Sequence, residues 1–342
     1  MKFVEFPKSV TRRKNKLDNL VFSSRVRFTR NLEGLKFPAF LSDKDKFDID
    51  ENLSDNIAKL PFEIVIENIE DIPRERIMIY AGTDIISREF VKSGRKLAYE
   101  VNGDWVILLN EDDHFRIFSI ETGYNIKNIA CRLIEVVRLI EKDIDFAFDE
   151  KWGYLTGSVL NMGTGMRMSV LVNLYGLVAT KRIEEFITNS GEMGYAVNNL
   201  VGESSDSGLF FVYNIYSMGL SEEQMVDEFD AFLNRLYEME MKARKEFFSD
   251  PDECEISYEE IVELINKDEI EWSALLYYIS LIDAMEGVLL NLKNRRELRN
   301  LVLTAKDDYL IYKKMVDKDK ISQARMEIIR SIVVQMKYKT SR

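Results

Sequence analysis

Proline placement is the feature of this sequence that most constrains its fold. The five prolines lie at positions 7, 38, 61, 73 and 251, so residues 74–250 contain none. Because proline lacks a backbone N–H and fixes its own φ angle, it marks places where helices and strands end. Pro251 lies in the polar stretch FFSDPDECEIS, directly after a long helical pattern. The sequence therefore predicts a domain boundary near residue 250, between a domain of residues 1–250 and a domain of residues 251–342.

Strand and helix patterns mix before this boundary, whereas the pattern after residue 255 is almost wholly helical. LAYEV-NG-DWVILLN predicts a β-hairpin with a type I′ turn at Asn102-Gly103, because both residue types tolerate positive φ angles. Alternating apolar residues predict strands over 114–120 and 209–218. Helical periodicity marks 124–145, 166–188 and 221–248. Ser221 and Gln224 predict a capping box at the start of the last of these helices.

Composition excludes several classes of protein. The length of 342 residues suits two domains, and the net charge of −12 argues against a nucleic acid as partner. No signal peptide is expected, and the apolar stretches near 168–180 and 273–291 are interpreted as core helices rather than membrane spans. Cys131 and Cys254 supply neither a disulfide framework nor metal-ligand spacing. A cytoplasmic protein with no membrane contact is expected.

Residues 110–117 read NEDDHFRI and place three acids beside Arg116 and His114, which is the only histidine of the chain. A charge run of this kind is usually a solvated turn after a strand. The alternative is the edge of an active site, where carboxylates lie beside a cation. The stretch by itself leaves both interpretations open.

Two further stretches suggest phosphate binding. In VFSSRVRFTRN, Arg25 and Arg27 alternate and would share one face of a strand, where an anion between them would relieve their repulsion. In GSVLNMGTGMRMSV, three glycines precede a helix predicted to start near Met166, with Arg167 in its first turn, an arrangement that suits an anion. A polar loop, NNLVGESSDSG, carries Glu203. Each stretch alone also has an ordinary structural interpretation, but together they supply cations and carboxylates for two substrates.

SSRVRFTRN, NEDDHFR and GYLTGSVLNMGTGMRMSV resemble, in order and spacing, the signatures of the ATP:guanidino phosphotransferases. This family includes creatine kinases, arginine kinases and bacterial protein arginine kinases. The resemblance covers about residues 20–220 and implies an α+β catalytic domain, a glutamine-synthetase-like antiparallel sheet flanked by helices, followed by an all-helical domain. Since the first motif begins at residue 23, we expect no helical N-terminal domain. The layout is similar to that of protein arginine kinases, in which the C-terminal helices mediate homodimerisation.

The resemblance implies transfer of the γ-phosphoryl group of ATP, with Mg²⁺ held mainly by nucleotide and water, to arginine side chains of proteins. It assigns the guanidinium side of the reaction to Glu111, Asp112 and Glu203. It assigns ATP binding to Ser23, Ser24, Arg25, Arg27, His114, Arg116, Arg167, Ser169 and Asn198. It also implies a zinc-finger activator and a Clp-type protease system as partners.

The sequence departs from the family pattern at several of these positions. The second acid of the NEEDH motif is shortened to Asp112, and an arginine expected before the mobile loop is Asn198. Ser158 and Val159 replace a cysteine and a proline, and Asp84 aligns with a histidine. The phosphoarginine-reading RDxxRA motif has only DKISQA (319–324) as its nearest counterpart. A catalytically impaired homologue with a regulatory binding role is therefore the alternative hypothesis, and a free-arginine kinase is a third.

Overall fold

The computed structural model describes residues 15–91, 95–202 and 207–338. The described residues divide into two compact units that are interleaved along the chain. Unit 1 comprises those within Met1–Ile77, Asp84–Val170 and Tyr213–Phe232. Unit 2 comprises those within Met78–Thr83, Leu171–Val212 and Leu233–Arg342. The domain boundary predicted near residue 250 is a different division, and it stays a prediction.

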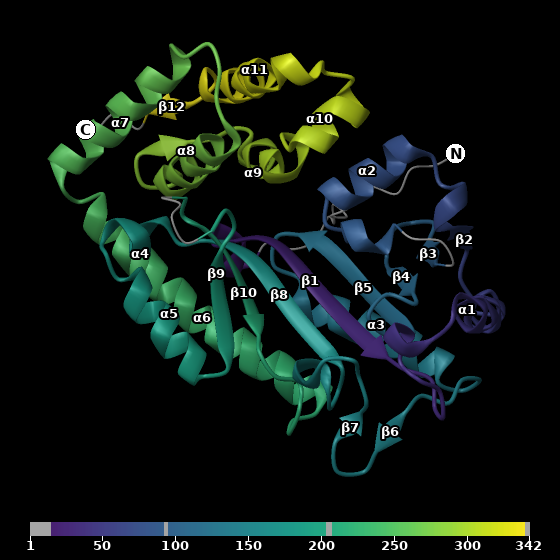
Figure 1. Cartoon of the computed structure of the whole chain (residues 1–342). Helices are drawn as coiled ribbons and strands as arrows, with labels where there is room; N and C mark the ends of the chain where they lie inside the picture. The colour runs from purple at the N-terminus through teal and green to yellow at the C-terminus, as the bar shows by residue number, and fades with distance from the viewer. Residues whose placement is uncertain (1–14, 92–94, 203–206, 339–342) are drawn as a thin grey trace. The chain divides into compact units, whose positions relative to one another are not determined.

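The strands of the described residues are β1 (Val21–Arg30), β2 (Ile64–Asn68), β3 (Lys96–Glu100), β4 (Val106–Leu109), β5 (Phe115–Thr122), β6 (Phe148–Asp149), β7 (Gly153–Tyr154), β8 (Met166–Asn173), β9 (Tyr195–Asn199), β10 (Leu209–Asn214), β11 (Leu290–Asn291) and β12 (Lys337–Tyr338). Eight of them form one sheet in the order β2-β3-β4-β5-β1-β8-β10-β9 (Figure 1). The pairs β2–β3, β3–β4, β4–β5 and β5–β1 are antiparallel. Two small sheets, β6–β7 and β11–β12, complete the strands.

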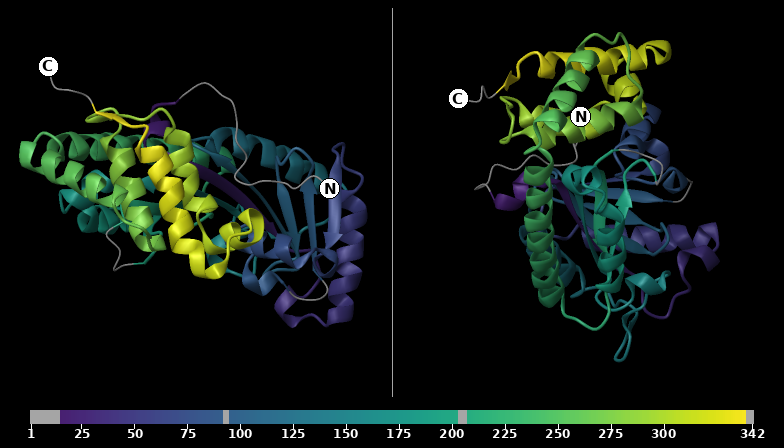
Figure 2. Two further views of the ribbon diagram at one scale, coloured as in Figure 1. Left: turned by 90° about the horizontal axis from the view of Figure 1, so that it is seen from above. Right: turned by 90° about the vertical axis from the view of Figure 1, so that its left-hand side faces the viewer.

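The helices are α1 (Asp43–Ile57), α2 (Arg74–Gly82), α3 (Ile126–Ile140), α4 (Tyr175–Ala179), α5 (Ile183–Glu192), α6 (Glu222–Phe247), α7 (Pro251–Ile265), α8 (Trp272–Met285), α9 (Arg295–Thr304), α10 (Asp307–Lys314) and α11 (Ile321–Val333). Short 3₁₀ segments are η1 (Lys16–Asn19), η2 (Pro38–Phe40), η3 (Ile69–Asp71), η4 (Arg88–Phe90), η5 (Val159–Asn161) and η6 (Lys318–Lys320). The helices from α7 onward, green to yellow in Figure 2, confirm the helical pattern predicted after residue 255. The large antiparallel sheet and these helices confirm the predicted α+β class.

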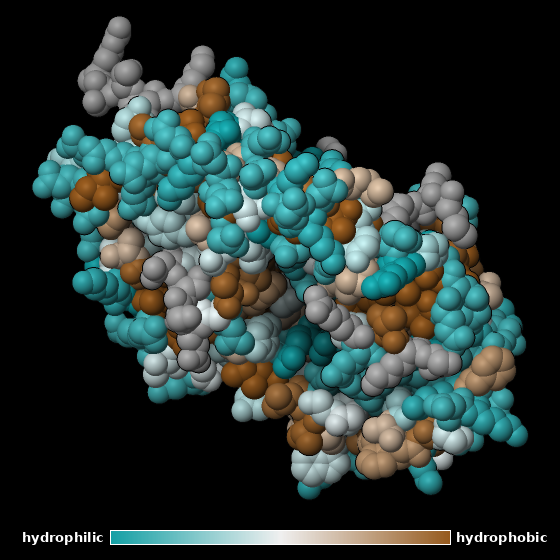
Figure 3. Space-filling view, turned by 45° about the horizontal axis from the view of Figure 1, so that its top comes forward, coloured by the Kyte–Doolittle hydropathy of each residue, from teal (hydrophilic) through white to brown (hydrophobic). Residues whose placement is uncertain are grey.

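Charged residues make up 31% of the chain, so a largely polar surface is expected. The face drawn in Figure 3 is mostly hydrophilic, and its apolar residues lie in separate patches. Among the described residues no helix is both long and apolar enough to cross a membrane.

Alternation along β1 explains why one face of unit 1 carries polar groups. Val26 and Phe28 are buried, whereas Arg25 and Arg27 are half-buried on the opposite face. The amphipathic helix α3 packs against β1 and β5 and is drawn behind them in Figure 1. Its buried residues follow helical spacing: Ile126, Ile129, Ala130, Leu133, Val136, Val137 and Ile140. One face of these strands therefore belongs to the core, and the other face is left for polar side chains.

Sequence patterns located two strands and two long helices correctly. The strands predicted over 114–120 and 209–218 are β5 and β10, and the helices predicted over 124–145 and 221–248 are α3 and α6. The capping box is confirmed, because Ser221 N–H donates to Gln224 Oε1 at 2.9 Å and Gln224 N–H donates to Ser221 Oγ at 3.2 Å.

The helix predicted over 166–188 is wrong. Residues 166–173 form strand β8, and two shorter helices, α4 and α5, follow it. In MRMSVLVN the first five residues alternate between buried and half-buried, which is the period of a strand, and the apolar run that follows fits a strand buried on both faces. The apolar stretch near 168–180 is therefore part strand and part helix, rather than one core helix.

The predicted hairpin is present as β3–β4, but its turn differs from the prediction. Gly103 N–H donates to Glu100 O at 2.9 Å, so Val101 and Asn102 are the central residues of the turn. Gly103 has a positive φ of 78°, whereas Asn102 is not among the described residues with positive φ, so the turn is not type I′. The Glu100 carboxylate stabilises this turn by accepting hydrogen bonds from Asn102 Nδ2 at 2.6 Å and from Asp104 N–H at 3.2 Å.

Unit 2 contains buried charges that are paired. Asp283 accepts from Arg295 Nε at 2.8 Å and from Arg299 Nε at 2.6 Å, and Glu240 accepts from Arg244 Nε at 2.6 Å. Burial alone would raise the pKa of Asp283, but the two guanidiniums hold it far below its usual value. These pairs contrast with Arg25, Arg27 and Arg167 of unit 1, for which the described residues supply no carboxylate partner.

Candidate active site

Four arginines of unit 1 lie on three adjacent strands. Arg25 and Arg27 belong to β1, Arg116 belongs to β5, and Arg167 belongs to β8, the other neighbour of β1. Their charges act on one another, since the other three all lower the pKa of Arg27. We call this side of β1, β5 and β8 the arginine face. The predicted alternation of Arg25 and Arg27 is confirmed, whereas the predicted place of Arg167 in a helical first turn is wrong, because it lies on a strand.

Three of these arginines have no carboxylate partner among the described residues. Arg25 Nη1 donates to the carbonyl oxygen of Asp84 at 3.4 Å, and Arg27 Nη2 donates to Asn161 Oδ1 at 3.2 Å. The Arg167 guanidinium lies over the Tyr213 ring, 5.0 Å from its centroid. Uncompensated cations close together are costly, which makes this face complementary to an anion with several negative charges.

Burial and mutual repulsion lower the pKa values of these three arginines. Burial is the larger cause and the Arg116 charge the second for Arg25, whose pKa falls to about 10. The pKa of Arg27 is lowered well below its usual value, first by burial and then by the charges of Arg116, Arg25 and Arg167. The pKa of Arg167 is lowered mainly by burial and to a smaller extent by Arg116. Both causes would be offset by a bound polyphosphate.

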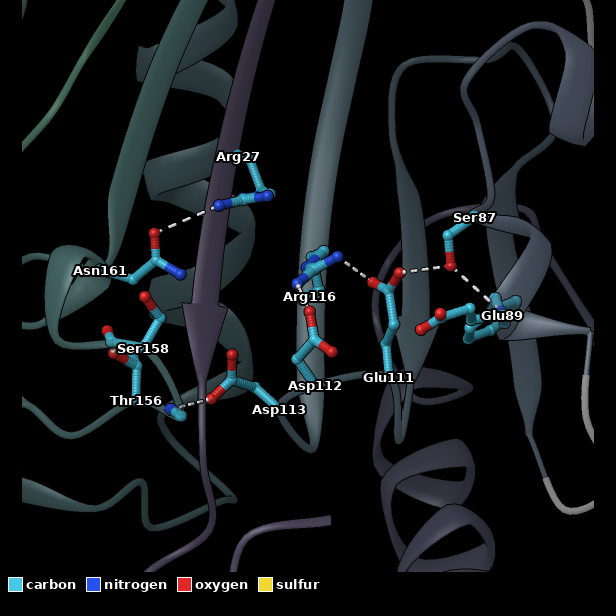
Figure 4. Close-up of polar contacts among 12 residues, drawn as sticks. Arg27, Ser87, Glu89, Glu111, Asp112, Asp113, Arg116, Thr156, Ser158 and Asn161 are labelled. Atoms are coloured by element: carbon cyan, nitrogen blue, oxygen red, sulfur yellow. Dashed lines mark hydrogen bonds and ion pairs between the residues drawn. The ribbon is translucent and has the colours of Figure 1, made fainter. Parts of the chain in front are cut away.

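Arg116 is the arginine of this face that contacts acids. It donates through Nη1 to Glu111 Oε2 and through Nη2 to Asp112 Oδ2, the latter at 3.1 Å (Figure 4). Ser87 Oγ donates to the second oxygen of Glu111 at 3.1 Å. The side chain of Glu111 is buried, whereas that of Asp112 is 78% exposed. The two predicted catalytic acids are therefore brought together beside a predicted phosphate-binding arginine.

The other polar residues of NEDDH hold the loop between β4 and β5 in place. Asn110 adopts a left-handed φ of 52°, and its Nδ2 donates to Asp50 Oδ1 at 2.8 Å and to Lys46 O at 2.9 Å. Asp113 Oδ1 accepts from Asn31 Nδ2 and from Gly157 N–H, both at 2.6 Å. The residues on either side of Glu111 and Asp112 thus fix the backbone that presents these two acids.

His114 lies in this buried scaffold rather than on the arginine face. Its side chain is fully buried, and its Nδ1 accepts a hydrogen bond from Leu32 N–H at 3.1 Å. Burial lowers the pKa of His114 to about 4, so its imidazole is neutral at physiological pH. This geometry favours a structural role over the predicted contact with nucleotide.

Ser23 and Ser24 lie on opposite faces of β1. Ser23 shares the face of Arg25, whereas Ser24 is buried on the α3 side. Ser24 Oγ donates to Gly123 O at 2.8 Å and accepts from Asn125 N–H at 3.0 Å. These bonds fix the start of α3, so Ser24 does not reach the arginine face from its described position.

The remaining predicted residues lie on or beyond β8. Ser169 is half-buried and alternates with Arg167, so both project from the same side of the strand. Asn198 is exposed on β9 in unit 2. Glu203 falls outside the described residues.

Sequence reasoning assigned no role to Asn161, Ser87 and Tyr213, which contact Arg27, Glu111 and Arg167 respectively. Asn161 lies inside the GSVLNMGTG stretch, where a lone amide among glycines is a usable signal. Ser87 and Tyr213 lie outside the three motifs that resemble the family signatures. They become visible only when the sheet brings distant segments together.

The donor set fits the phosphate chain of a nucleotide. Three guanidiniums find no carboxylate partner in the part of the chain that the structure describes, and a fourth is held by Glu111 and Asp112. All four are cations on neighbouring strands of one sheet. Among the described residues, no group of three or more histidines, cysteines or acids is arranged to hold a metal ion.

Comparisons with known proteins agree with this chemistry. A family model described as ATP:guanido phosphotransferase, C-terminal catalytic domain, matches residues 50–243. The protein-arginine kinase of Clostridium novyi is 31% identical over 238 residues, which cover 68% of this chain and 69% of that protein. The protein-arginine kinase of Bacillus velezensis is 32% identical over 240 residues, which cover 67% of this chain and 65% of that protein. The matches thus span about two thirds of each relative.

Solved structures show the same fold at lower identity. The substrate-free duplicated taurocyamine kinase from Schistosoma mansoni is 23% identical, with a TM-score of 0.61, and the match covers 72% of this chain and 38% of that chain. Lombricine kinase is 20% identical, with a TM-score of 0.58, and the match covers 65% of this chain and 66% of that chain.

Proposed function

Because this chain belongs to the ATP:guanido phosphotransferase family, we propose that it transfers the γ-phosphoryl group of Mg-ATP to a guanidino nitrogen of arginine side chains in proteins. The observation that carries the proposal is the charge pattern of the arginine face. Arg25, Arg27 and Arg167 are half-buried and have no carboxylate partner among the described residues. A nucleoside triphosphate supplies the negative charge that this arrangement lacks.

In the proposed reaction, the arginines align the phosphates and offset the charge that develops as the bond between the γ-phosphorus and the ADP oxygen breaks. Phosphoryl transfer is accelerated mainly by such positioning and charge stabilisation. Ser23 and Ser169 project from the same side of their strands as the arginines and would donate further hydrogen bonds. Mg²⁺ would arrive with the nucleotide.

The acceptor guanidinium must lose a proton as its nitrogen bonds to phosphorus, because its own pKa is above 12. Glu111 and Asp112 are the carboxylates that would orient it and accept that proton. Both acids contact Arg116 in this structure. Phosphate binding to Arg116 would compete for that arginine and release carboxylate oxygens toward the acceptor.

The second candidate function is a nucleotide-binding regulatory protein without turnover. Two observations favour it: Asp112 is one methylene shorter than the family's second acid, and Asn198 stands where the family has a further arginine. A displacement of about 1 Å at a reacting group can lower a rate by ~10²-fold.

A labelling experiment separates these functions. Purified protein would be incubated with γ-labelled Mg-ATP and an unfolded protein, and acid-labile label on the acceptor would be measured. We expect transfer by the wild type, its loss in Arg27→Gln, and wild-type transfer in Arg138→Gln, a control on the exposed side of α3. Nucleotide binding without transfer would support the regulatory protein, and absence of Mg-ADP binding by calorimetry would exclude both functions.

The family resemblance supports further proposals about partners, assembly and location. These are a zinc-finger activator, a Clp-type protease system, a homodimer formed through residues 251–342, and a cytoplasmic location. Protein substrates are favoured over free arginine by the protein-arginine kinases among the relatives.

A further inference from the structure

Five exposed apolar side chains lie at one end of unit 1, and we call them the apolar rim: Phe148, Val159, Leu160, Tyr216 and Met218. They come from the β6–β7 hairpin, from η5 and from the segment that follows β10. Their exposed fractions range from 38% for Met218 to 73% for Val159. Exposed apolar side chains that gather on neighbouring segments, unlike scattered ones, are typical of surfaces that bind other molecules, and the bridges Tyr154–Gly163 and Gly163–Ser217 make these segments neighbours.

Hydrogen bonds join the three segments of the rim around Gly163. Tyr154 N–H donates to Gly163 O at 2.8 Å, and Thr164 N–H donates to Ser217 O at 2.8 Å. Ser217 Oγ donates to Met162 O, also at 2.8 Å. Gly163 has a φ of 103°, and a Cβ at this position would lie 2.3 Å from Ser217 O, so the close approach requires glycine. The rim is therefore a preformed surface.

The rim is continuous with the candidate active site. Val159 and Leu160 lie between Gly157, whose N–H donates to Asp113, and Asn161, which accepts from Arg27. Figure 4 shows Asn161 and Ser158 on the side of the site next to Arg27 and Asp113. The loop that carries these two apolar side chains is thus held at both ends by residues of the site.

The segments of the rim are rich in acids. Segments 141–163 and 216–223 together contain seven acids and two lysines, and two of the acids, Glu141 and Glu223, pair with Arg30 and Arg138. Asp112, 78% exposed, adds a carboxylate at the edge of the site. A ligand that complements this region combines positive charge with apolar groups.

We propose that the apolar rim binds the apolar side chains that flank a target arginine in an extended polypeptide segment. This inference rests on the proposed transfer to arginine side chains. The acids Glu111 and Asp112 would hold the arginine, and Val159 and Leu160 would contact the residues next to it. Free arginine carries no flanking side chains and would leave the rim unused. The rim thus distinguishes a polypeptide substrate from the free amino acid.

Two peptides of equal length and charge test this inference. Each contains one arginine, flanked in one peptide by leucine and phenylalanine and in the other by glycine and serine. We measure their Kd values by fluorescence anisotropy in the presence of Mg-ADP, and their KM and kcat values by label transfer. The wild type should bind the apolar-flanked peptide about tenfold more tightly, which corresponds to burial of roughly two methylene groups.

The double variant Val159→Ser with Leu160→Ser should remove this preference. We expect its Kd and KM for the apolar-flanked peptide to rise to those of the other peptide, with kcat and the Kd of Mg-ADP unchanged. Phe47→Ser is the matched control, because Phe47 is 54% exposed on α1 of the same unit, which Figure 1 draws apart from the β6–β7 hairpin. It should bind both peptides like the wild type.

The outcomes separate the rim from the proposed function. Equal affinity of the wild type for both peptides, or equal losses in the double variant and in Phe47→Ser, would overturn the inference. Preferential binding without label transfer would leave the rim in place and refute the transfer reaction. A change of oligomeric state in the double variant by light scattering would identify a second copy of this chain as the occupant and overturn the peptide-binding role.

Discussion

Asp113 accepts a hydrogen bond from the backbone N–H of Gly157 at 2.6 Å, and this contact joins the two loops that carry the candidate site. One loop presents Glu111 and Asp112, and the other presents Asn161 to Arg27. A Cβ on residue 157 would lie 3.1 Å from Asp112 O, so glycine lets the loops approach closely. The acids and the arginine face are thereby held in one arrangement.

Replacing Asp113 should therefore weaken both the fold and the site. Asp113→Ala would leave Gly157 N–H and one N–H of Asn31 Nδ2 without an acceptor, at a cost of about 1–3 kcal/mol for each buried donor, while Asn31 Nδ2 keeps its bond to Leu155 O. Asp113→Asn keeps an acceptor oxygen and should lose less. Urea unfolding of both variants measures this, and equal stabilities for Asp113→Ala and the wild type would contradict the role of this carboxylate.

Charge neutralisation at two arginines should have opposite effects on stability. Arg167→Gln removes a cation that lacks a carboxylate partner among the described residues, so the free energy of unfolding should stay equal or rise. Arg116→Gln leaves buried Glu111 without its partner, so the free energy of unfolding should fall. Both variants should bind Mg-ADP at least about tenfold more weakly, because each loses a charge-assisted contact.

Urea unfolding and calorimetry of the same two proteins check this contrast. A loss of stability in Arg167→Gln equal to that in Arg116→Gln would show that Arg167 is compensated in the ligand-free protein. Unchanged Mg-ADP affinity in both would remove the arginine face from nucleotide binding.

Asp50 should make stability depend on pH. Burial is the main reason why the pKa of Asp50 is raised from 3.8 to about 7. The charge of Lys96, the hydrogen bond from Asn110 and the charge of Arg95 lower this pKa, and the charge of Glu51 raises it. The folded state therefore binds a proton more tightly than the unfolded chain does. The resulting stability is fully present below pH 3.8 and is lost as the pH rises toward 7.

Asp50→Asn should remove this component, which is on the order of a few kcal/mol. The unfolding free energy of the variant minus that of the wild type should increase between pH 4 and about 7. Asp48→Asn, at an exposed position of the same helix, is the control and should follow the wild type. Parallel pH profiles for Asp50→Asn and the wild type would place the titration of Asp50 outside this range.

Local patterns predicted the strands that carry Arg25, Arg27 and Arg116, because alternation along β1 and β5 follows directly from the period of a strand. They failed for β8, where an apolar run carries little periodic signal and the pairing with β1 and β10 decides the structure. The functions of Asn110, Asp113 and His114 depend on partners 60 to 83 residues away in the sequence. No local pattern contains that information.

The two serines of SSRVRF illustrate a further limit. Alternation alone places Ser23 and Ser24 on opposite faces, yet the motif resemblance assigned both to ATP. The buried bonds of Ser24 to Gly123 and Asn125 give it a structural role that motif matching does not reveal.

A homodimer is predicted from the helical segment. α7 carries exposed apolar side chains at Ile256, Tyr258 and Val262, which association would cover. Light scattering over a wide concentration range should give twice the chain mass of 40.0 kDa at the upper end. Tyr258→Asp and Val262→Asp, one turn apart on α7, should shift the protein toward the monomer. A wild-type monomer at every concentration would contradict the prediction.

The last prediction concerns Asp112 and Asn198, two of the positions at which this chain departs from its family. Asp112 is 78% exposed, so the longer side chain of Asp112→Glu has room and should carry its carboxylate further toward the acceptor. Asn198→Arg would add a cation at the position where the family has one. We expect each variant to transfer label faster than the wild type, by about tenfold for the acid, and the double variant to be fastest.

Because the family resemblance assigns both positions to the same reaction, we expect their effects to be non-additive. Asp112→Asn is the matched control, since it keeps the size of the side chain and removes its charge, and it should lower transfer. A wild type faster than all three restored variants would show that Asp112 and Asn198 are adapted to this site. Turnover only in the double variant would instead identify the natural chain as a nucleotide-binding regulatory protein.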